Sequence, residues 1–154
     1  MKQFIVFILI IVCSVPVFAQ GRGKQEDFEL YKAKRVSYMT EKLQLTPQEA
    51  QKFWPIYNEY DKLRGEYHEK RRELEKKAWE NYDKLSEADF KKLNAEVVSL
   101  SVKECGLVKT YNDKFLGVLP AKKVILVGPT ENEFRFKMIR EFRQKERDGN
   151  HDSK

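Results

Sequence analysis

The sequence predicts an all-α protein, an elongated hairpin of about four helices. Charged residues make up 35% of the 154-residue chain, and its 7 glycines and 5 prolines are few for a fold of strands and tight turns. Apolar residues recur at spacings of three to five along most of the chain, with no alternating strand pattern. Two segments also carry helix start signals, one at Thr46 and one at Ser86.

The N-terminal segment is typical of a secretory signal peptide covering residues 1–19. The basic Lys2 precedes an unbroken apolar run over residues 4–12, and Val17 and Ala19 supply the small residues that a cleavage site requires. We therefore expect an exported protein whose mature chain begins at Gln20.

Two alternatives remain open for this leader. A transmembrane anchor would use the same apolar run, which is short for a full span. A lipoprotein signal would use Cys13, but Val12 precedes it where a small residue is expected. In each case one predicted domain covers residues 20–147, and a polar, disordered tail covers residues 148–154.

The mature chain is basic. Loss of the leader removes one lysine and no acidic residue, so 29 basic residues face 24 acidic ones and the net charge is +5. A basic chain often binds nucleic acid, but an exported chain seldom meets any. Acidic or unfolded polypeptide, or an anionic membrane surface, is the expected class of partner.

The first predicted helix covers residues 25–44, which contain no glycine or proline. Its apolar residues recur at helical spacing and are expected to face inward. They are Phe28, Tyr31, Val36, Met39 and Leu43.

The second predicted helix covers residues 47–85 and has a complete start signal. Thr46 can cap the amides of the first turn, and Pro47 has no amide hydrogen that needs a partner. Glu49 can reach back to the cap amide and complete a capping box. Pro55 lies inside the helix and predicts a kink. The expected inward stripe is Phe53, Tyr57, Tyr60, Tyr67, Leu74, Ala78 and Tyr82.

The third predicted helix, residues 87–114, has the same start signal in Ser86 and Asp89. Its expected apolar seam is Phe90, Leu93, Val97, Leu100, Leu107, Tyr111 and Phe115. Glu104 interrupts this seam. Antiparallel counting from the tight turn at Leu85–Ser86 places Glu104 near Tyr67 and Arg71. Because a carboxylate on a seam needs a partner, we expect it to pair with Arg71 or Arg64.

The fourth predicted helix begins at Pro120 and is expected to break or kink at Gly128-Pro129. Thr130 would then cap a continuation over residues 131–147. The residues expected to face inward are Phe134, Met138, Ile139 and Phe142.

No pattern typical of an enzyme or a metal centre stands out, and we expect neither catalysis nor a cofactor. His68 and His151 have no nearby metal-ligand residues, and no serine or cysteine has an evident base partner. Cys105 is the one cysteine of the mature chain. We expect it to be a small core residue on a helix, and an intermolecular disulfide across a dimer is the alternative.

The second helix concentrates tyrosine, tryptophan and arginine, the residue types enriched where proteins bind proteins. Part of this set is expected to form a polypeptide-binding face, and the alternative is that its aromatic residues form the core of the bundle. The candidate binding residues are Trp54, Tyr57, Tyr60, Arg64, Tyr67, Arg71, Arg72 and Trp79.

Three stretches resemble the Spy/CpxP-like periplasmic proteins, which carry LTxxQ motifs. They are LTPQEAQKFWPIYNEY from Leu45, LSEADF from Leu85, and FLGVLPAKKVILVGPTENEF from Phe115. The chain is most similar to Bacteroidetes-type members described as sensors of ECF-type sigma factors or as periplasmic heavy-metal sensors. Glu49 and Asp89 stand where the family has glutamine, and these replacements keep the capping chemistry.

The resemblance implies a periplasmic, cradle-shaped homodimer in the envelope stress response. It also implies chaperoning of unfolded envelope polypeptides without ATP. A regulator that docks a membrane-bound signalling or anti-sigma partner is the alternative. The histidine and methionine ligands of metal-sensing relatives have no counterpart here, so a metal sensor is the disfavoured alternative.

Overall fold

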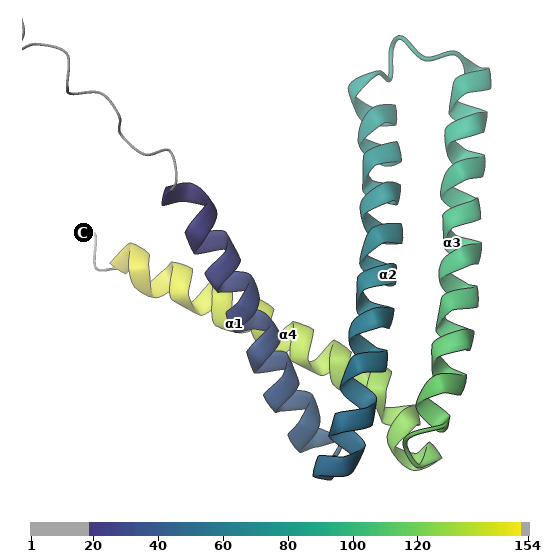
Figure 1. Ribbon diagram of the computed structural model, residues 1–154. Coiled ribbons are helices and arrows are strands. Elements are labelled where there is room, and N and C mark those ends of the chain that lie inside the picture. The colour runs from purple at the N-terminus through teal and green to yellow at the C-terminus, as the bar shows by residue number, and fades with distance from the viewer. Residues whose placement is uncertain (1–18, 152–154) are drawn as a thin grey trace, which may run out of the picture. The chain divides into compact units, whose positions relative to one another are not determined.

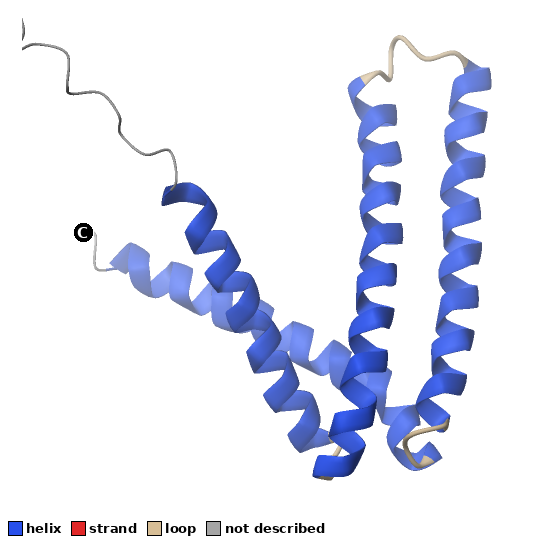
Figure 2. Cartoon of the chain, viewed as in Figure 1, coloured by secondary structure: helices blue, strands red, loops and turns tan. Residues whose placement is uncertain are grey.

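The computed structural model describes residues 19–151 as four helices joined by short turns, with no strand in that range (Figures 1 and 2). They are α1 (Ala19–Lys42), α2 (Pro47–Glu80), α3 (Glu87–Leu116) and α4 (Ala121–His151). This confirms the predicted all-α class. Residues 1–18, which include the leader's apolar run and Val17 of its cleavage motif, lie outside the described range. Residues 152–154 also lie outside it. The chain divides into two compact units, Met1–Ser37 and Tyr38–Lys154.

The first unit contains α1 as far as Ser37. Lys32 Nζ lies 4.2 Å from the centre of the Phe28 ring, a cation–π contact along one face of the helix. The predicted inward stripe is wrong at Phe28 and Val36, which are both exposed. Within residues 19–37, the described part of this unit, α1 is a single helix without a second element to cover Phe28 or Val36, and Tyr31 is half-buried.

The second unit begins with the last turn of α1, where Met39 and Leu43 are buried as predicted. Gln44 adopts a positive φ of 48°, which ends the helix and turns the chain toward α2. Leu45, at the edge of burial, then joins the same core.

The predicted capping box of α2 is confirmed. The amide of Glu49 donates to Thr46 Oγ1 at 3.3 Å, and the amide of Thr46 donates to Glu49 Oε2 at 2.8 Å. Lys123 Nζ of α4 also donates to this carboxylate, at 2.7 Å, and to the Gln44 carbonyl at 2.6 Å. These bonds lower the pKa of Glu49 below its ordinary value, the Lys123 contact most of all. The capping residue Glu49 therefore also binds α4, through Lys123, to the first turn of α2.

The capping box of α3 is confirmed as well. The amide of Asp89 donates to Ser86 Oγ at 3.2 Å, and the amide of Ser86 donates to Asp89 Oδ2 at 3.1 Å. The preceding helix, α2, stops at Glu80, five residues before the predicted end. There Asn81 Nδ2 donates to the Lys77 carbonyl at 3.0 Å. An asparagine that bonds the last turn competes with continuation of the helix.

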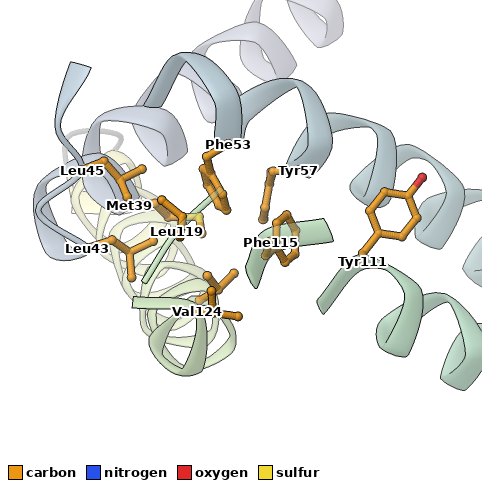
Figure 3. Close-up of a cluster of buried hydrophobic side chains, with 10 residues drawn as sticks. Met39, Leu43, Leu45, Phe53, Tyr57, Tyr111, Phe115, Leu119 and Val124 are labelled. Carbon is orange, nitrogen blue, oxygen red and sulfur yellow. The ribbon is translucent and has the colours of Figure 1, made fainter. Parts of the chain in front are cut away.

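Helices α2 and α3 lie side by side as an antiparallel hairpin whose core is richest at the end near α4 (Figures 1 and 3). Phe53 and Tyr57 of α2 are fully buried, and their rings lie 5.2 and 6.5 Å from that of Phe115. Leu119, in the turn before α4, and Val124, in the first turn of α4, complete the cluster. Aromatic contacts at such distances add to the free energy gained by burial.

The predicted seam of α3 is confirmed, since each of its seven residues is buried or half-buried. The stripe of α2 is confirmed except at Tyr82, which follows the end of the helix and is exposed. The prediction for Cys105 as a core residue is wrong because its side chain is exposed.

Helix α4 continues through Gly128 and Pro129, so the predicted break is wrong. The ring of a proline in a helix clashes with the Cβ as well as the N–H of the residue before it, and glycine has no Cβ. Pro129 removes the hydrogen bond to the Ile125 carbonyl, but both residues are exposed, so water can reach that carbonyl. Thr130 is therefore a buried helical residue and not a cap. The helix ends at His151, within the predicted tail. The helix α2 likewise continues through Pro55, and the kink there stays a prediction.

Candidate polypeptide-binding surface

Three of the eight candidate residues on α2 lie in the core, not on a binding face. Tyr57 is 0% exposed, which corrects its assignment as a contact residue. Trp54 and Tyr60 are half-buried and pack against the same core cluster. Trp54 Nε1 donates to Thr40 Oγ1 at 3.3 Å, so the polar edge of the indole is also used inside the protein.

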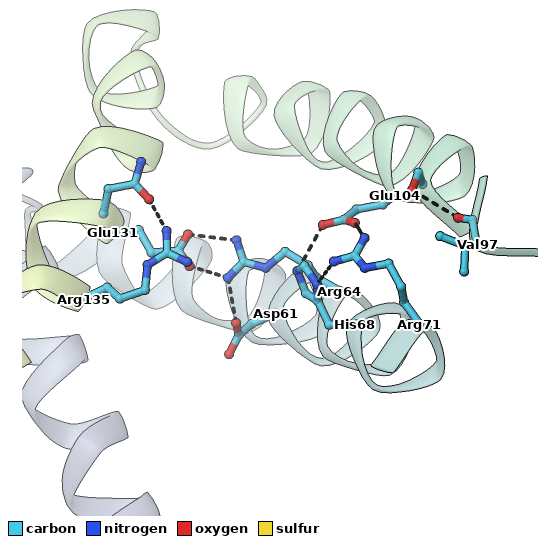
Figure 4. A network of polar contacts seen from close by, with 10 residues as sticks. Asp61, Arg64, His68, Arg71, Val97, Glu104, Glu131 and Arg135 are labelled. Atoms are coloured by element: carbon cyan, nitrogen blue, oxygen red, sulfur yellow. Dashed lines mark hydrogen bonds and ion pairs between the residues drawn. The ribbon is translucent and has the colours of Figure 1, made fainter. Parts of the chain in front are cut away.

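Arg64 binds inside the protein and ties α2 to α4 (Figure 4). Its Nη1 donates to Glu131 Oε2 at 3.1 Å, and its Nη2 donates to Glu131 Oε1 and, at 3.0 Å, to Asp61 Oδ1. Burial disfavours the charged form of Arg64, but the hydrogen bonds and charge of Glu131 outweigh it, so the pKa of the guanidinium is raised above its ordinary value. The guanidinium also lies 5.0 Å from the Tyr60 ring centre.

Glu104 of α3 was predicted to pair with Arg71 or Arg64, and its partner is Arg71. Arg71 Nη1 lies 3.1 Å from Glu104 Oε2, and His68 Nε2 lies 3.1 Å from Glu104 Oε1. Arg71 Nη2 also contacts His68 Nδ1 (Figure 4). If Arg71 donates to Nδ1, the His68 proton lies on Nε2 and points at the carboxylate. The three side chains therefore complete one another's hydrogen bonds between α2 and α3.

Two of the candidates, Arg72 and Trp79, are exposed, while Tyr67 is half-buried. Arg72 pairs with Glu69 on the solvent side of α2. Trp79 is 81% exposed, and the neighbouring Tyr82 is 67% exposed although its ring lies 5.6 Å from that of Phe90. We call Trp79 and Tyr82 the hairpin tip.

A second exposed apolar surface lies on α4, and sequence reasoning missed it. Ile125, Phe136, Ile139 and Phe142 are all exposed, whereas Ile139 and Phe142 were predicted to face inward. Phe134 is buried, and residues two apart on a helix lie on opposite sides. The alternation Phe134–Arg135–Phe136 is the sequence signal that α4 has two apolar faces.

No family model, curated protein or solved structure matches this chain. Within residues 19–151, no cluster of three or more His, Cys, Asp and Glu side chains has the arrangement to hold a metal ion. In that same range, none of the helices has the length and apolar character of a membrane span.

Proposed function

We propose that this chain is an exported, periplasmic polypeptide-binding protein of the envelope stress response. In this proposal it acts as an ATP-independent chaperone, resembles the Spy/CpxP-like proteins, and is not an enzyme. The observation that supports it is the hairpin tip, where Trp79 and Tyr82 are exposed although four other aromatic residues, Phe53, Trp54, Tyr57 and Tyr60, lie in or against the core. Exposed tryptophan and tyrosine give large contact areas at little entropic cost.

Charges of both signs surround the tip. Lys76 pairs with Glu80 at 3.6 Å, and Lys91 pairs with Glu87 at 3.6 Å, all on exposed side chains. Such pairs contribute little to stability and exchange easily with water or with a passing chain. A surface of this kind supports weak, adaptable binding of many polypeptides.

A regulator is the second candidate. The exposed aromatic residues of the hairpin are concentrated at one tip, as in an interface that binds one partner through a small hot spot. The partner would be a membrane-bound signalling or anti-sigma protein. One specific high-affinity partner would favour this role over broad, weak binding. A metal sensor remains the disfavoured candidate, and calorimetric titration with zinc or copper tests it.

The proposal includes a homodimer, and Cys105 gives it a simple test. Cys105 is exposed on α3, where a second copy of the chain can reach its thiol. Electrophoresis without reductant, with Cys105→Ser as control, shows whether a disulfide joins two copies. Sedimentation of the parent chain and of Cys105→Ser shows whether a dimer exists without the disulfide.

The deciding experiment is suppression of aggregation without ATP, with two unrelated unfolding proteins as clients. The chain from Gln20 should protect both. Trp79→Ser/Tyr82→Ser should lose protection, whereas the matched control Val98→Ser/Val102→Ser, also at exposed apolar positions, should keep it. If both variants lose protection equally, the hairpin tip is not the surface that binds the client. Protection of neither client by the parent chain rejects the chaperone role and favours the regulator. N-terminal sequencing of the exported protein tests the cleavage before Gln20.

A further inference from the structure

The outer face of α4 carries an apolar ridge that the polypeptide-binding proposal does not use. Ile125 is 74% exposed, Phe136 and Phe142 are each 63% exposed, and Ile139 is 41% exposed. Eleven residues make about three helical turns, so Ile125 and Phe136 lie on the same side, and Ile139 follows one turn later. The opposite side of α4 is the buried one, with Val127 and Phe134. We call these four exposed residues the α4 ridge.

Basic side chains border the ridge on its C-terminal half. Residues 135–148 hold six basic and three acidic residues, a net charge of +3. Arg135 and Arg143 lie next to Phe136 and Phe142 in sequence, and Arg140 lies four positions after Phe136; all three arginines are exposed. Glu133, a nearby acid, is bound by Lys42 at 2.9 Å. Arg143 lies five helical turns after Ile125, so arginine and apolar side chains share the exposed side of α4.

We propose that the α4 ridge binds the surface of an anionic lipid bilayer. Phenylalanine and isoleucine on one face, with arginine beside them, are the composition of helices that lie in the membrane interface. The apolar side chains would enter the boundary between headgroups and acyl chains. The arginines would reach lipid phosphates while their stems cover apolar surface. The charges among the apolar residues fit a helix that lies along the bilayer.

The shape and charge of the ridge favour a bilayer over another protein chain. The ridge is the convex side of one helix, whereas peptides dock into grooves or add to sheet edges. A second copy of this chain would bring its own arginines against Arg135, Arg140 and Arg143, and like charges repel across an interface. A bilayer deforms around a convex helix and supplies negative charge.

The test is flotation of the chain from Gln20 with vesicles, since the leader's apolar run would itself enter lipid. One set contains phosphatidylcholine alone, and the other contains phosphatidylcholine and phosphatidylglycerol in equal parts. The protein should float with the anionic vesicles and stay behind with the neutral ones. The charge variant Arg135→Gln/Arg140→Gln/Arg143→Gln should bind roughly a hundred-fold more weakly at low salt. The apolar variant Phe136→Ser/Phe142→Ser should also lose binding.

Matched controls separate the ridge from general charge and apolarity. Lys91→Gln/Lys92→Gln/Lys109→Gln removes three exposed charges from α3, and Val98→Ser/Val102→Ser removes two exposed apolar groups; both should bind like the parent. Circular dichroism establishes that each variant is folded. In Phe136→Trp, the added fluorescence should shift to the blue on anionic vesicles.

Three results would overturn the proposal. They are equal flotation with neutral and anionic vesicles, controls that lose binding as much as the ridge variants, and no shift in Phe136→Trp. Because the aggregation assay contains no lipid, its failure and the failure of lipid binding are distinguishable.

Discussion

Arg71 on α2 and Glu104 on α3 are 33 positions apart in sequence, yet their Nη1 and Oε2 atoms lie 3.1 Å apart. Both side chains are about a quarter exposed or less, and His68 completes the group by contacting each of them. This contact fixes the register of the hairpin midway between its core and its tip.

Loss of Arg71 should destabilise the hairpin. Arg71→Met leaves the Glu104 carboxylate half-buried beside His68 without its guanidinium partner, which should lower the free energy of unfolding by about 1–3 kcal/mol. Urea denaturation measures this. Arg72→Met is the control, because Arg72 pairs with Glu69 in solvent and its loss should cost about 0.5 kcal/mol or less. Equal effects of the two substitutions would contradict a specific role for the Arg71–Glu104 pair.

Arg64→Lys should loosen α4. A lysine cannot bridge both Glu131 oxygens and also reach Asp61. The free energy of unfolding should therefore fall by about 1–2 kcal/mol although the positive charge is retained. Hydrogen exchange of the α4 amides near Glu131 should accelerate more than that of the hairpin. Lys76→Arg, at an exposed pair with Glu80, should change neither quantity. Unchanged exchange in Arg64→Lys would show that other contacts hold α4.

Truncation of a buried aromatic residue of α2 should lower stability far more than truncation of an exposed one. Tyr57→Ala removes a fully buried ring and should cost about 3–5 kcal/mol, the range for large core aromatics. Trp79→Ala removes an exposed ring and should change stability by about 0.5 kcal/mol or less. Thermal and urea unfolding measure both. A large loss in Trp79→Ala would mean that the tip is structural.

Acid should weaken the helix caps. The pKa of Glu49 is lowered mainly by the hydrogen bond from Lys123, and that of Asp89 mainly by the Ser86 hydroxyl. A carboxyl whose folded pKa is lowered stabilises the fold above its unfolded pKa of about 4, and this stabilisation is lost as pH falls through the folded pKa. The melting temperature should therefore drop as the pH falls below about 4.

The variant Glu49→Gln/Asp89→Asn tests this pH dependence, because amides keep some capping capacity but do not titrate in this range. Its melting temperature should vary less with acid than that of the parent. An unchanged pH profile would assign the acid sensitivity to other carboxylates, such as Glu59 or Glu133, whose pKa values are also lowered by lysine contacts.

Glycine replacement should stabilise the hairpin at two sites. Gly65 and Gly106 lie inside helices, and a Cβ added at either would meet nothing within 4 Å. Gly65→Ala and Gly106→Ala should each add about 0.5–1 kcal/mol. At Gly117 a Cβ would lie 3.2 Å from the Lys114 carbonyl oxygen, so Gly117→Ala should bring no such gain. Urea midpoints compare the three variants.

The candidate surface was only partly predictable because residue type does not report burial. Trp54, Tyr57 and Trp79 are all aromatic residues of α2, yet the first two pack on the core and the third is exposed. Whether each of these side chains is buried depends on where α3 and α4 cover α2. That packing involves residues far from them in the sequence. The same holds for Ile139 and Phe142, whose helical spacing alone suggested an inward face.

The sequence by itself determined the helices and their starts. Capping boxes, proline at a first turn and apolar periodicity act within a few residues, so Thr46, Ser86 and the seam of α3 were readable directly. It also indicated Arg71 or Arg64 as the partner of Glu104, because a tight turn fixes antiparallel register, and the partner is Arg71. Only the tertiary structure decided the continuity of α4 through Gly128-Pro129, the exposure of Cys105, and the partner of Arg64. Those outcomes depend on packing and solvent access between segments far apart in the chain, which local patterns do not specify.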